Sequence, residues 1–209
     1  MVQGFFVKVY QVPSASMTPT LAPGDRLLVN RLAYQSEDPK VGDIVVFERP
    51  ADWGDRAADR GAFRTAIGWF GDIFGFGPSN SDALVKRIVA GPGDVVSCCG
   101  SGGQLVLNDQ PVDEPYLGSD LPFEQGALDC ETPSRSQRCF EPIVIPDDRY
   151  LMLGDNRAQS SDGISRCRGL GPDDAPGCAR LVSREDIVGE AFFVLLPFDR
   201  WGALAERPG

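Results

Sequence analysis

The chain contains a serine and a lysine in settings where they could act together as nucleophile and base. It has no histidine, which excludes the Ser-His-Asp triad, the Cys-His dyad and histidine metal sites. A serine nucleophile then needs another base, and a lysine can serve once burial in an apolar pocket lowers its pKa. Lys86 is a candidate, because Leu84 and Ile88 share its face if residues 83–90 form a strand. On this pattern alone, an edge-strand lysine that extends to water is the simpler interpretation.

Ser16 is the matching candidate for the nucleophile. It lies in a polar turn directly after a predicted strand over residues 5–13, where its hydroxyl could project into a cleft. Its own main-chain N–H and the Ser14 hydroxyl could then hold an oxyanion. Serines in such a run are more often ordinary turn residues. Only the combination with Lys86 makes a hydrolase a competitive interpretation.

These residues need a scaffold, and the composition indicates a mostly β protein. The 209 residues include 24 Gly and 17 Pro, which favour many turns and short strands over long helices. A hairpin is predicted over residues 105–112, with its tip at Asn108-Asp109. The other strands are predicted, in chain order, at residues 5–13, 26–30, 43–48, 83–90, 143–145, 150–153 and 187–196.

Changes in composition and hydrophobic pattern divide the chain into five parts. Residues 1–50 would begin the β core, residues 81–97 would carry the strand of Lys86, and residues 143–209 would complete the core. Residues 98–142 would form a β subdomain or loop insertion, in which the polar stretch 118–141 is tied by a disulfide. Residues 51–80 have helical periodicity, and their helix would either pack on the core or touch a membrane surface. The apolar residues of that pattern are Phe63, Ala66, Ile67, Phe70, Ile73 and Phe74.

The net charge and the cysteines indicate which binding partners are excluded and in which cellular compartment the protein works. The net charge of −10 argues against nucleic acid. The six cysteines include no C-x-x-C, which favours disulfides outside the cytosol over a metal site. Pairs Cys130–Cys139 and Cys167–Cys178 would close short loops and leave Cys98 and Cys99 unexplained, so the connectivity stays open among 15 pairings. The longest apolar run, residues 191–196, is too short to cross a bilayer, so we expect an anchoring segment upstream of Met1.

Four sequence blocks, taken in order, resemble bacterial type I signal peptidases. They are V-P-S-A-S-M-T-P-T-L-A-P-G-D at 12–25, G-D-I-V-V-F at 42–47, V-K-R-I-V-A-G-P-G-D at 85–94 and G-D-N-R-A-Q-S-S-D at 154–162. That family consists of membrane-anchored serine peptidases that remove signal peptides with a Ser-Lys dyad. The resemblance implies a fold of antiparallel sheets, no metal or cofactor, and a location on the extracytoplasmic face of the bacterial plasma membrane.

The resemblance also assigns roles to the residues of these blocks. It implies that Ser16 is the nucleophile and Lys86 the general base of an acyl-enzyme mechanism. Ser14 would donate its hydroxyl to the oxyanion hole beside the Ser16 N–H, and Ser160 would orient Lys86 by a hydrogen bond.

The last block would also supply structural residues near the site. Arg87 would pair with Asp162, and the residues bracing this wall would be Asp155, Asn156, Arg157 and Asp162. In the family, Ser-Arg follows this last aspartate directly. Here Gly163-Ile164 comes before Ser165-Arg166, so no role is carried over to Arg166.

The implied partners are signal peptides of exported preproteins and the membrane lipid surface. An extended peptide would bind as an added strand, and shallow pockets would admit the small residues of an Ala-x-Ala site. The residues expected to contact the substrate are Tyr10, Gln11, Val12, Pro13, Met17, Ala83, Leu84 and Val85.

Two other interpretations compete with a signal peptidase. One is another Ser-Lys peptidase, such as a self-cleaving repressor, which would usually carry a DNA-binding segment that this acidic chain lacks. The other is a β-rich extracytoplasmic binding module that has lost catalysis. The retention of Ser14, Ser16, Lys86 and Ser160 argues against such a loss.

Overall fold

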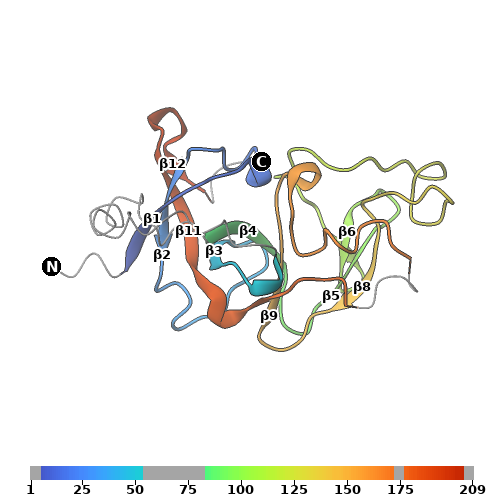
Figure 1. The fold of residues 1–209 in the computed structure, drawn as a ribbon, viewed down its shortest axis with the longest axis horizontal. Helices are drawn as coiled ribbons and strands as arrows, with labels where there is room; N and C mark the ends of the chain where they lie inside the picture. The colour runs from blue at the N-terminus through green and yellow to red at the C-terminus, as the bar shows by residue number, and fades with distance from the viewer. Residues whose placement is uncertain (1–5, 54–82, 172–176, 205–209) are drawn as a thin grey trace.

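The computed structural model describes residues 6–53, 83–171 and 177–204, and these form two antiparallel β-sheets (Figure 1). The mostly β prediction is therefore confirmed. The larger sheet has the strand order β1 (Val7–Gln11), β2 (Arg26–Asn30), β11 (Ile187–Leu196), β3 (Ile44–Glu48), β4 (Ala83–Ala90), β9 (Arg149–Leu153) and β10 (Val182–Ser183), with β12 (Gly202–Ala203) paired to β11. The smaller sheet has the order β7 (Gln110–Pro111), β6 (Leu105–Leu107), β5 (Val95–Cys98) and β8 (Phe140–Val144).

The helical elements of the described residues are short 3₁₀ turns. They are η1 (Ala15–Met17), η2 (Ala51–Trp53), η5 (Arg157–Gln159), η6 (Arg184–Asp186) and η7 (Phe198–Arg200). No helix in the described segments has the length and hydropathy that a bilayer crossing requires. The amphipathic helix predicted within residues 51–80 falls, beyond η2, outside the described residues.

The eight-stranded sheet buries apolar side chains on both of its faces. Side chains on the two faces of β4 enter different clusters: Val85 packs with Val46 in one, whereas Ile88 packs with Phe47 in the other. A strand buried on both faces has a continuous apolar run rather than an alternating one, and the sequence of β3 is Ile-Val-Val-Phe-Glu. Lys86 therefore lies in a strand that has little contact with water.

Most strands match their predicted positions, and three strands, β5, β10 and β12, were missed. Strands predicted at 26–30, 83–90 and 187–196 have those bounds in the structure. The predicted hairpin also forms, with Asn108 at φ 50° and Asp109 at φ 63°, as a tight turn between β6 and β7 requires. Strand β5 (Val-Val-Ser-Cys) has only four residues and almost no alternation, and β10 and β12 have two residues each, so none of the three carries a pattern that predicts a strand.

The cysteines form three disulfides. Cys130–Cys139 and Cys167–Cys178 are the two short-loop pairs that the sequence suggested. The remaining pair, Cys98–Cys99, joins adjacent residues at the end of β5. All three disulfides lie between residues 98 and 178, which includes most of the four-stranded sheet (Figure 1).

Candidate active site

The loop that carries Ser16 is closed by main-chain hydrogen bonds. The Val12 N–H donates to Asp25 O, and the Gly24 N–H donates to Val12 O, each at 2.9 Å. The Asp25 carboxylate accepts the Ala22 N–H at 2.9 Å and the Arg200 Nε at 3.1 Å. These bonds fix the ends of the loop, so that η1 holds Ser16 with only 8% of its surface exposed.

Lys86 reaches Ser16 from β4. Its side chain is 4% exposed, and its Nζ makes a short hydrogen bond to Ser16 Oγ across a separation of 70 residues. The register of the sheet sets this position, since Lys86 lies opposite Val45 of β3 in the interior of the sheet. The two residues that sequence reasoning paired are thus in direct contact.

The surroundings of Lys86 favour its neutral form. Burial lowers the pKa of this amine from its ordinary value of 10.5 to about 8. The carboxylates of Asp162 and Asp155 act in the opposite direction, and the Arg49 guanidinium adds to the lowering of the pKa. A lysine with a pKa near 8 carries a useful fraction of unprotonated amine near neutral pH, as a general base requires.

The Ser14 hydroxyl lies beside the nucleophile candidate. Its Oγ is 3.3 Å from Ser16 Oγ, and Ser14 itself is exposed at the start of η1. A hydroxyl in this position can donate to an oxygen that develops charge next to Ser16.

Ser160 is close to the site but does not make the bond expected of it. A Cβ placed on Gly154 would lie 2.4 Å from Ser160 Oγ and 2.3 Å from Ser16 O, so these groups crowd against that glycine. The buried Ser160 Oγ has no hydrogen-bond partner among the described residues. The predicted hydrogen bond to Lys86 is therefore absent, and the Lys86 amine bonds to Ser16 Oγ.

Asn156 braces the Ser16 loop from the opposite side. Its N–H donates to Ser16 O at 3.1 Å. Its Nδ2 donates to Ala15 O at 3.2 Å and to Thr18 Oγ1 at 2.9 Å. Asn156 therefore holds the loop at Ala15, at Ser16 itself and at Thr18.

The predicted pair Arg87–Asp162 is wrong. Arg87 donates to both carboxylate oxygens of Asp155, at 2.9 and 2.7 Å. Asp162 is instead paired with Arg168 at 3.1 Å. The side chain of Arg87 leaves β4 on the face where Asp155 also accepts the Thr20 hydroxyl at 2.6 Å, so this aspartate is the nearer partner.

Sequence reasoning missed two residues that form ion pairs with this wall of the site, Glu114 and Arg168. The buried Arg157 pairs with the buried Glu114 and donates its Nε to Gly154 O at 3.1 Å. Arg168 forms the ion pair with Asp162. The sequence had raised only Arg166 as an arginine that follows this aspartate. Both partners come from irregular segments whose positions depend on the fold rather than on any local pattern.

Most of the predicted substrate contacts come together in one cluster. Tyr10, Val12, Met17 and Val85 share a buried cluster, and Ala83 packs against it. Other predicted contacts lie elsewhere: Leu84 packs in the second cluster of the sheet, while the side chains of Gln11 and Pro13 are exposed.

Two strand edges border this cluster. Strand β1 is the first strand of the eight-stranded sheet. Val12 follows it directly, and the main-chain N–H and O of Val12 are already hydrogen-bonded to Asp25 O and the Gly24 N–H. The pairing of β4 with β9 begins only at Arg87. The edge of β4 at residues 83–85 is thus without a partner strand in the described part of the chain, which is where an extended peptide could pair.

A serine hydroxyl in contact with a buried lysine of lowered pKa is the arrangement of serine hydrolases that use a lysine base. Comparison with known proteins gives the family. The family model for signal peptidase, peptidase S26, matches residues 1–196. The chain therefore belongs to the S26 signal peptidases, which are hydrolases that remove signal peptides from preproteins.

Two relatives in sequence agree with this family. Signal peptidase I of Mycobacterium tuberculosis is 32% identical over 209 residues, which cover 96% of this chain and 68% of the relative. A probable signal peptidase I-2 of Synechocystis is 32% identical over 205 residues, covering 98% and 70% of the two chains. A signal peptidase I crystal structure from Enterococcus faecalis matches 77% of this chain and 98% of its own, with 20% identity and a TM-score of 0.39.

Proposed function

We propose that Ser16 and Lys86 are the catalytic dyad that cleaves signal peptides from exported preproteins after a small residue. The observation that carries this proposal is the direct contact between Lys86 Nζ and Ser16 Oγ inside a site from which water is largely excluded. Burial lowers the pKa of Lys86 to about 8, so that its neutral amine can accept the serine proton.

The reaction proceeds through an acyl-enzyme. Ser16 Oγ attacks the scissile carbonyl as its proton passes to Lys86, and the oxyanion is held by the Ser14 hydroxyl and the Ser16 N–H. Protonated Lys86 then gives its proton to the departing amine of the mature protein. In the second half, Lys86 takes a proton from the water that hydrolyses the ester. These steps require no metal or cofactor.

The substrate binds as an extended strand that pairs with the β4 edge at residues 83–85 and passes the Val12 side chain just beyond the end of β1. Alternate side chains of such a strand point the same way, so two small side chains of an Ala-x-Ala site face Val12, Met17 and Val85. These three residues are buried in one cluster, which supports shallow pockets that admit alanine and exclude larger side chains.

The enzyme contacts the extracytoplasmic surface of the membrane through the turn after β11. Phe198 and Trp201 are 82% and 61% exposed there, and large exposed aromatics are suited to a membrane interface. Arg200, between them, donates to Pro19 O and Thr20 O at 3.2 and 3.1 Å, which attaches this turn to the Ser16 loop. The three disulfides support an oxidising compartment.

The dyad is tested by cleavage of an exported precursor with an Ala-x-Ala site, in detergent and across pH. The parent should cut after the final alanine, while Ser16→Ala and Lys86→Ala should lose at least about 1,000-fold in rate. The parental rate should rise with pH through about 8, because only the neutral amine of Lys86 accepts a proton. Lys40→Ala, at an exposed lysine, is the matched control and should cut normally. Equal cutting by the parent and both dyad variants would exclude this dyad.

Membrane contact is tested separately by flotation with vesicles that contain anionic lipid. The double substitution Phe198→Ser and Trp201→Ser should reduce the bound fraction. Val144→Ser is the control, because Val144 is also exposed but lies in the four-stranded sheet. Unchanged flotation of the double variant would show that Phe198 and Trp201 do not contact the membrane.

A further inference from the structure

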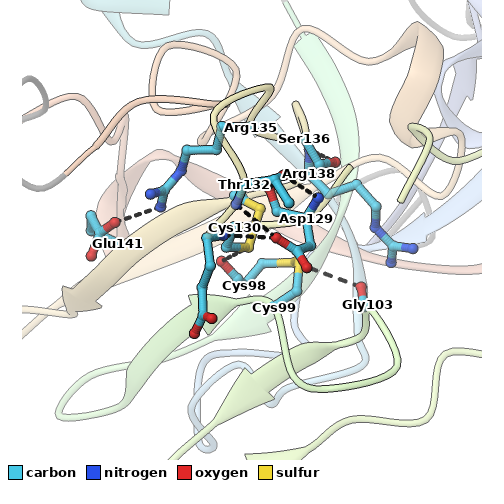
Figure 2. Close-up of a disulfide and its surroundings, with 12 residues drawn as sticks. Cys98, Cys99, Gly103, Asp129, Cys130, Thr132, Arg135, Ser136, Arg138 and Glu141 are labelled. Atoms are coloured by element: carbon cyan, nitrogen blue, oxygen red, sulfur yellow. Dashed lines mark hydrogen bonds and ion pairs between the residues drawn. A yellow bond between two sulfur atoms is a disulfide. The ribbon is translucent and has the colours of Figure 1, made fainter. Parts of the chain in front are cut away.

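The disulfides at the edge of the four-stranded sheet form a cluster of sulfur atoms. The Sγ atoms of Cys99, Cys130 and Cys139 all lie within 4.8 Å of one another. Cys98 Sγ is bonded to Cys99 and lies 3.7 Å from Gly103 O. Figure 2 shows the side chains of Cys98, Cys99 and Cys130 converging. Two disulfides that are independent in the sequence are therefore neighbours in space.

The loop that carries Cys130 and Cys139 is held by bonds other than its own disulfide. The Ser136 N–H donates to Asp129 O at 2.9 Å, and the Ser136 hydroxyl donates to Pro122 O at 2.6 Å. The Asp129 carboxylate accepts the Glu131 N–H at 2.8 Å. Cys130 Sγ also lies 3.6 Å from Cys98 O. None of the three hydrogen bonds uses a cysteine sulfur, so the loop keeps these bonds when its disulfide opens.

The sulfur atoms differ in access to solvent. Cys98 and Cys139 are buried, whereas Cys99 and Cys130 are only partly buried. Thiol–disulfide exchange requires a thiolate that can approach a disulfide sulfur, and access controls its rate. Cys99 is both reachable from outside and adjacent to the second disulfide, so it can connect an external thiol to Cys130–Cys139.

We propose that Cys98, Cys99, Cys130 and Cys139 form a thiol–disulfide exchange site for an external dithiol. The dithiol donates two electrons and two protons to Cys98–Cys99 and becomes a disulfide. Cys99 then loses its proton to solvent, and its thiolate attacks Cys130 or Cys139. One S–S bond forms to Cys99 and the Cys130–Cys139 bond breaks. The released thiolate takes a proton, so one disulfide and two thiols remain.

Exchange changes which segments of the chain are joined. Each of the two present disulfides closes a local link, one between adjacent residues and one across nine positions. A bond from Cys99 to Cys130 or Cys139 would instead join the end of β5 to the 130–139 loop. Cys167–Cys178 is outside the three-sulfur group and serves as an internal reference.

Serine substitutions at the two adjacent cysteines test the proposal without any reductant. Cys98→Ser leaves a Cys99 thiol beside the intact second disulfide, so at pH 8 about one molecule in ten or more should carry a Cys99–Cys130 or Cys99–Cys139 link. Cys99→Ser is the matched control. Its remaining thiol, at Cys98, is buried against the Gly103 and Gln104 carbonyls, so Cys130–Cys139 should persist.

The links are identified by mass spectrometry after the free thiols are alkylated. Trypsin and a glutamate-specific protease separate the relevant cysteines by cutting after Glu114, Glu124, Arg135 and Arg138. Exclusive Cys130–Cys139 linkage in Cys98→Ser would overturn the proposal, and so would equal exchange in both variants. An intact Cys167–Cys178 link shows that each variant has folded.

Titration of the unsubstituted protein with dithiothreitol provides a second test that does not depend on a variant. At about one equivalent, links between Cys99 and the 130–139 loop should form while Cys167–Cys178 stays oxidised. Reduction of Cys167–Cys178 first, or loss of Cys130–Cys139 without any new link, would refute the exchange. Peptidase activity does not enter either readout, so the proposal stands or falls separately from the catalytic dyad.

Discussion

The eight-stranded sheet is stabilised by apolar burial on both faces, whereas two of the three disulfides lie in the four-stranded sheet and its loops. The third disulfide, Cys167–Cys178, lies in the segment between β9 and β10 and packs in the same apolar cluster as residues of the four-stranded sheet. Val45, Phe47 and Ile88 are fully buried in the larger sheet, and none of its described strands contains a cysteine. The strands of the smaller sheet are two to five residues long. Short strands bury little surface, so covalent links add what packing does not. The dyad lies in the region that excludes water by packing.

The two regions meet along the wall of the active site. The segment after β7 places Glu114 against Arg157, and the Tyr116 ring lies 3.8 Å from the Arg87 guanidinium. The Gly118 N–H donates to Asp155 O at 3.1 Å. The disulfide-bonded region therefore supports the side chains that hold the Ser16 loop, although it contributes neither member of the dyad.

Replacement of the buried lysine should have the largest effect, because it should abolish activity and at the same time raise stability. Lys86→Met should lose at least about 1,000-fold in cleavage rate. It should also raise the free energy of unfolding at pH 7 by about 3 kcal/mol, because the folded pKa of about 8 lies below the ordinary 10.5. The cost of the charged lysine is full below pH 8 and declines as pH rises from 8 toward 10.5. Urea titrations should therefore show a smaller gain at pH 9, about 2 kcal/mol.

The control for that experiment is Lys40→Met, at a lysine on the surface. It should change the free energy of unfolding by no more than about 0.5 kcal/mol at either pH. A Lys86→Met protein that is less stable than the parent at both pH values would contradict the idea that the larger sheet tolerates a costly buried amine for catalysis.

Breaking the ion pair at the junction of the two regions should destabilise the protein. Glu114→Gln leaves the Arg157 guanidinium buried without a counter-charge, since their side chains are 3% and 4% exposed. The expected loss in the free energy of unfolding is about 3–5 kcal/mol, measured by urea titration. Glu141→Gln breaks the more exposed Arg135–Glu141 pair and should cost at most about 1 kcal/mol. An equal loss of unfolding free energy in both variants would show that the buried pair at the junction contributes no more to stability than the exposed pair.

The longer strands of the larger sheet were predictable from sequence because they are runs of β-forming residues bounded by turn signals, whereas its two-residue strands β10 and β12 were too short to predict. The Ser16 and Lys86 pairing also followed from residue type, the absence of histidine and the resemblance of four blocks. The partners of Arg87 and Asp162 did not follow, because side chains from irregular segments compete for each carboxylate and only the fold decides which is nearer.

The smaller sheet was less predictable for a related reason. Cysteine spacing suggested two of the disulfides, yet β5 was missed and no local pattern brings Cys99 close to Cys130. Chain segments that are ordered by cross-links and by hydrogen bonds to loops need no hydrophobic period. Their positions depend on contacts that are distant in sequence.

Removal of the Cys167–Cys178 disulfide should destabilise the apolar cluster that this disulfide shares with the smaller sheet, with little effect on catalysis. The double substitution Cys167→Ala and Cys178→Ala opens a link across 11 positions. The chain-entropy estimate for such a loop is about 3 kcal/mol, to be measured by urea titration. Cleavage at 25 °C should remain within about threefold of the parent, because the dyad is held by the larger sheet. A large loss of cleavage in a folded variant would show that the two regions are coupled more tightly than their packing indicates.

Removal of the adjacent pair should have the smallest effect on stability. Cys98–Cys99 joins neighbouring residues, so it restricts almost none of the unfolded chain, whereas the entropic effect of a disulfide grows with the loop that it closes. The double substitution Cys98→Ala and Cys99→Ala should therefore change the free energy of unfolding by less than about 1 kcal/mol. A loss as large as that from the Cys167–Cys178 variant would mean that this pair stabilises the native state directly. A small loss leaves the reactivity of its sulfur atoms, rather than cross-linking, as the property that distinguishes it from the other two disulfides.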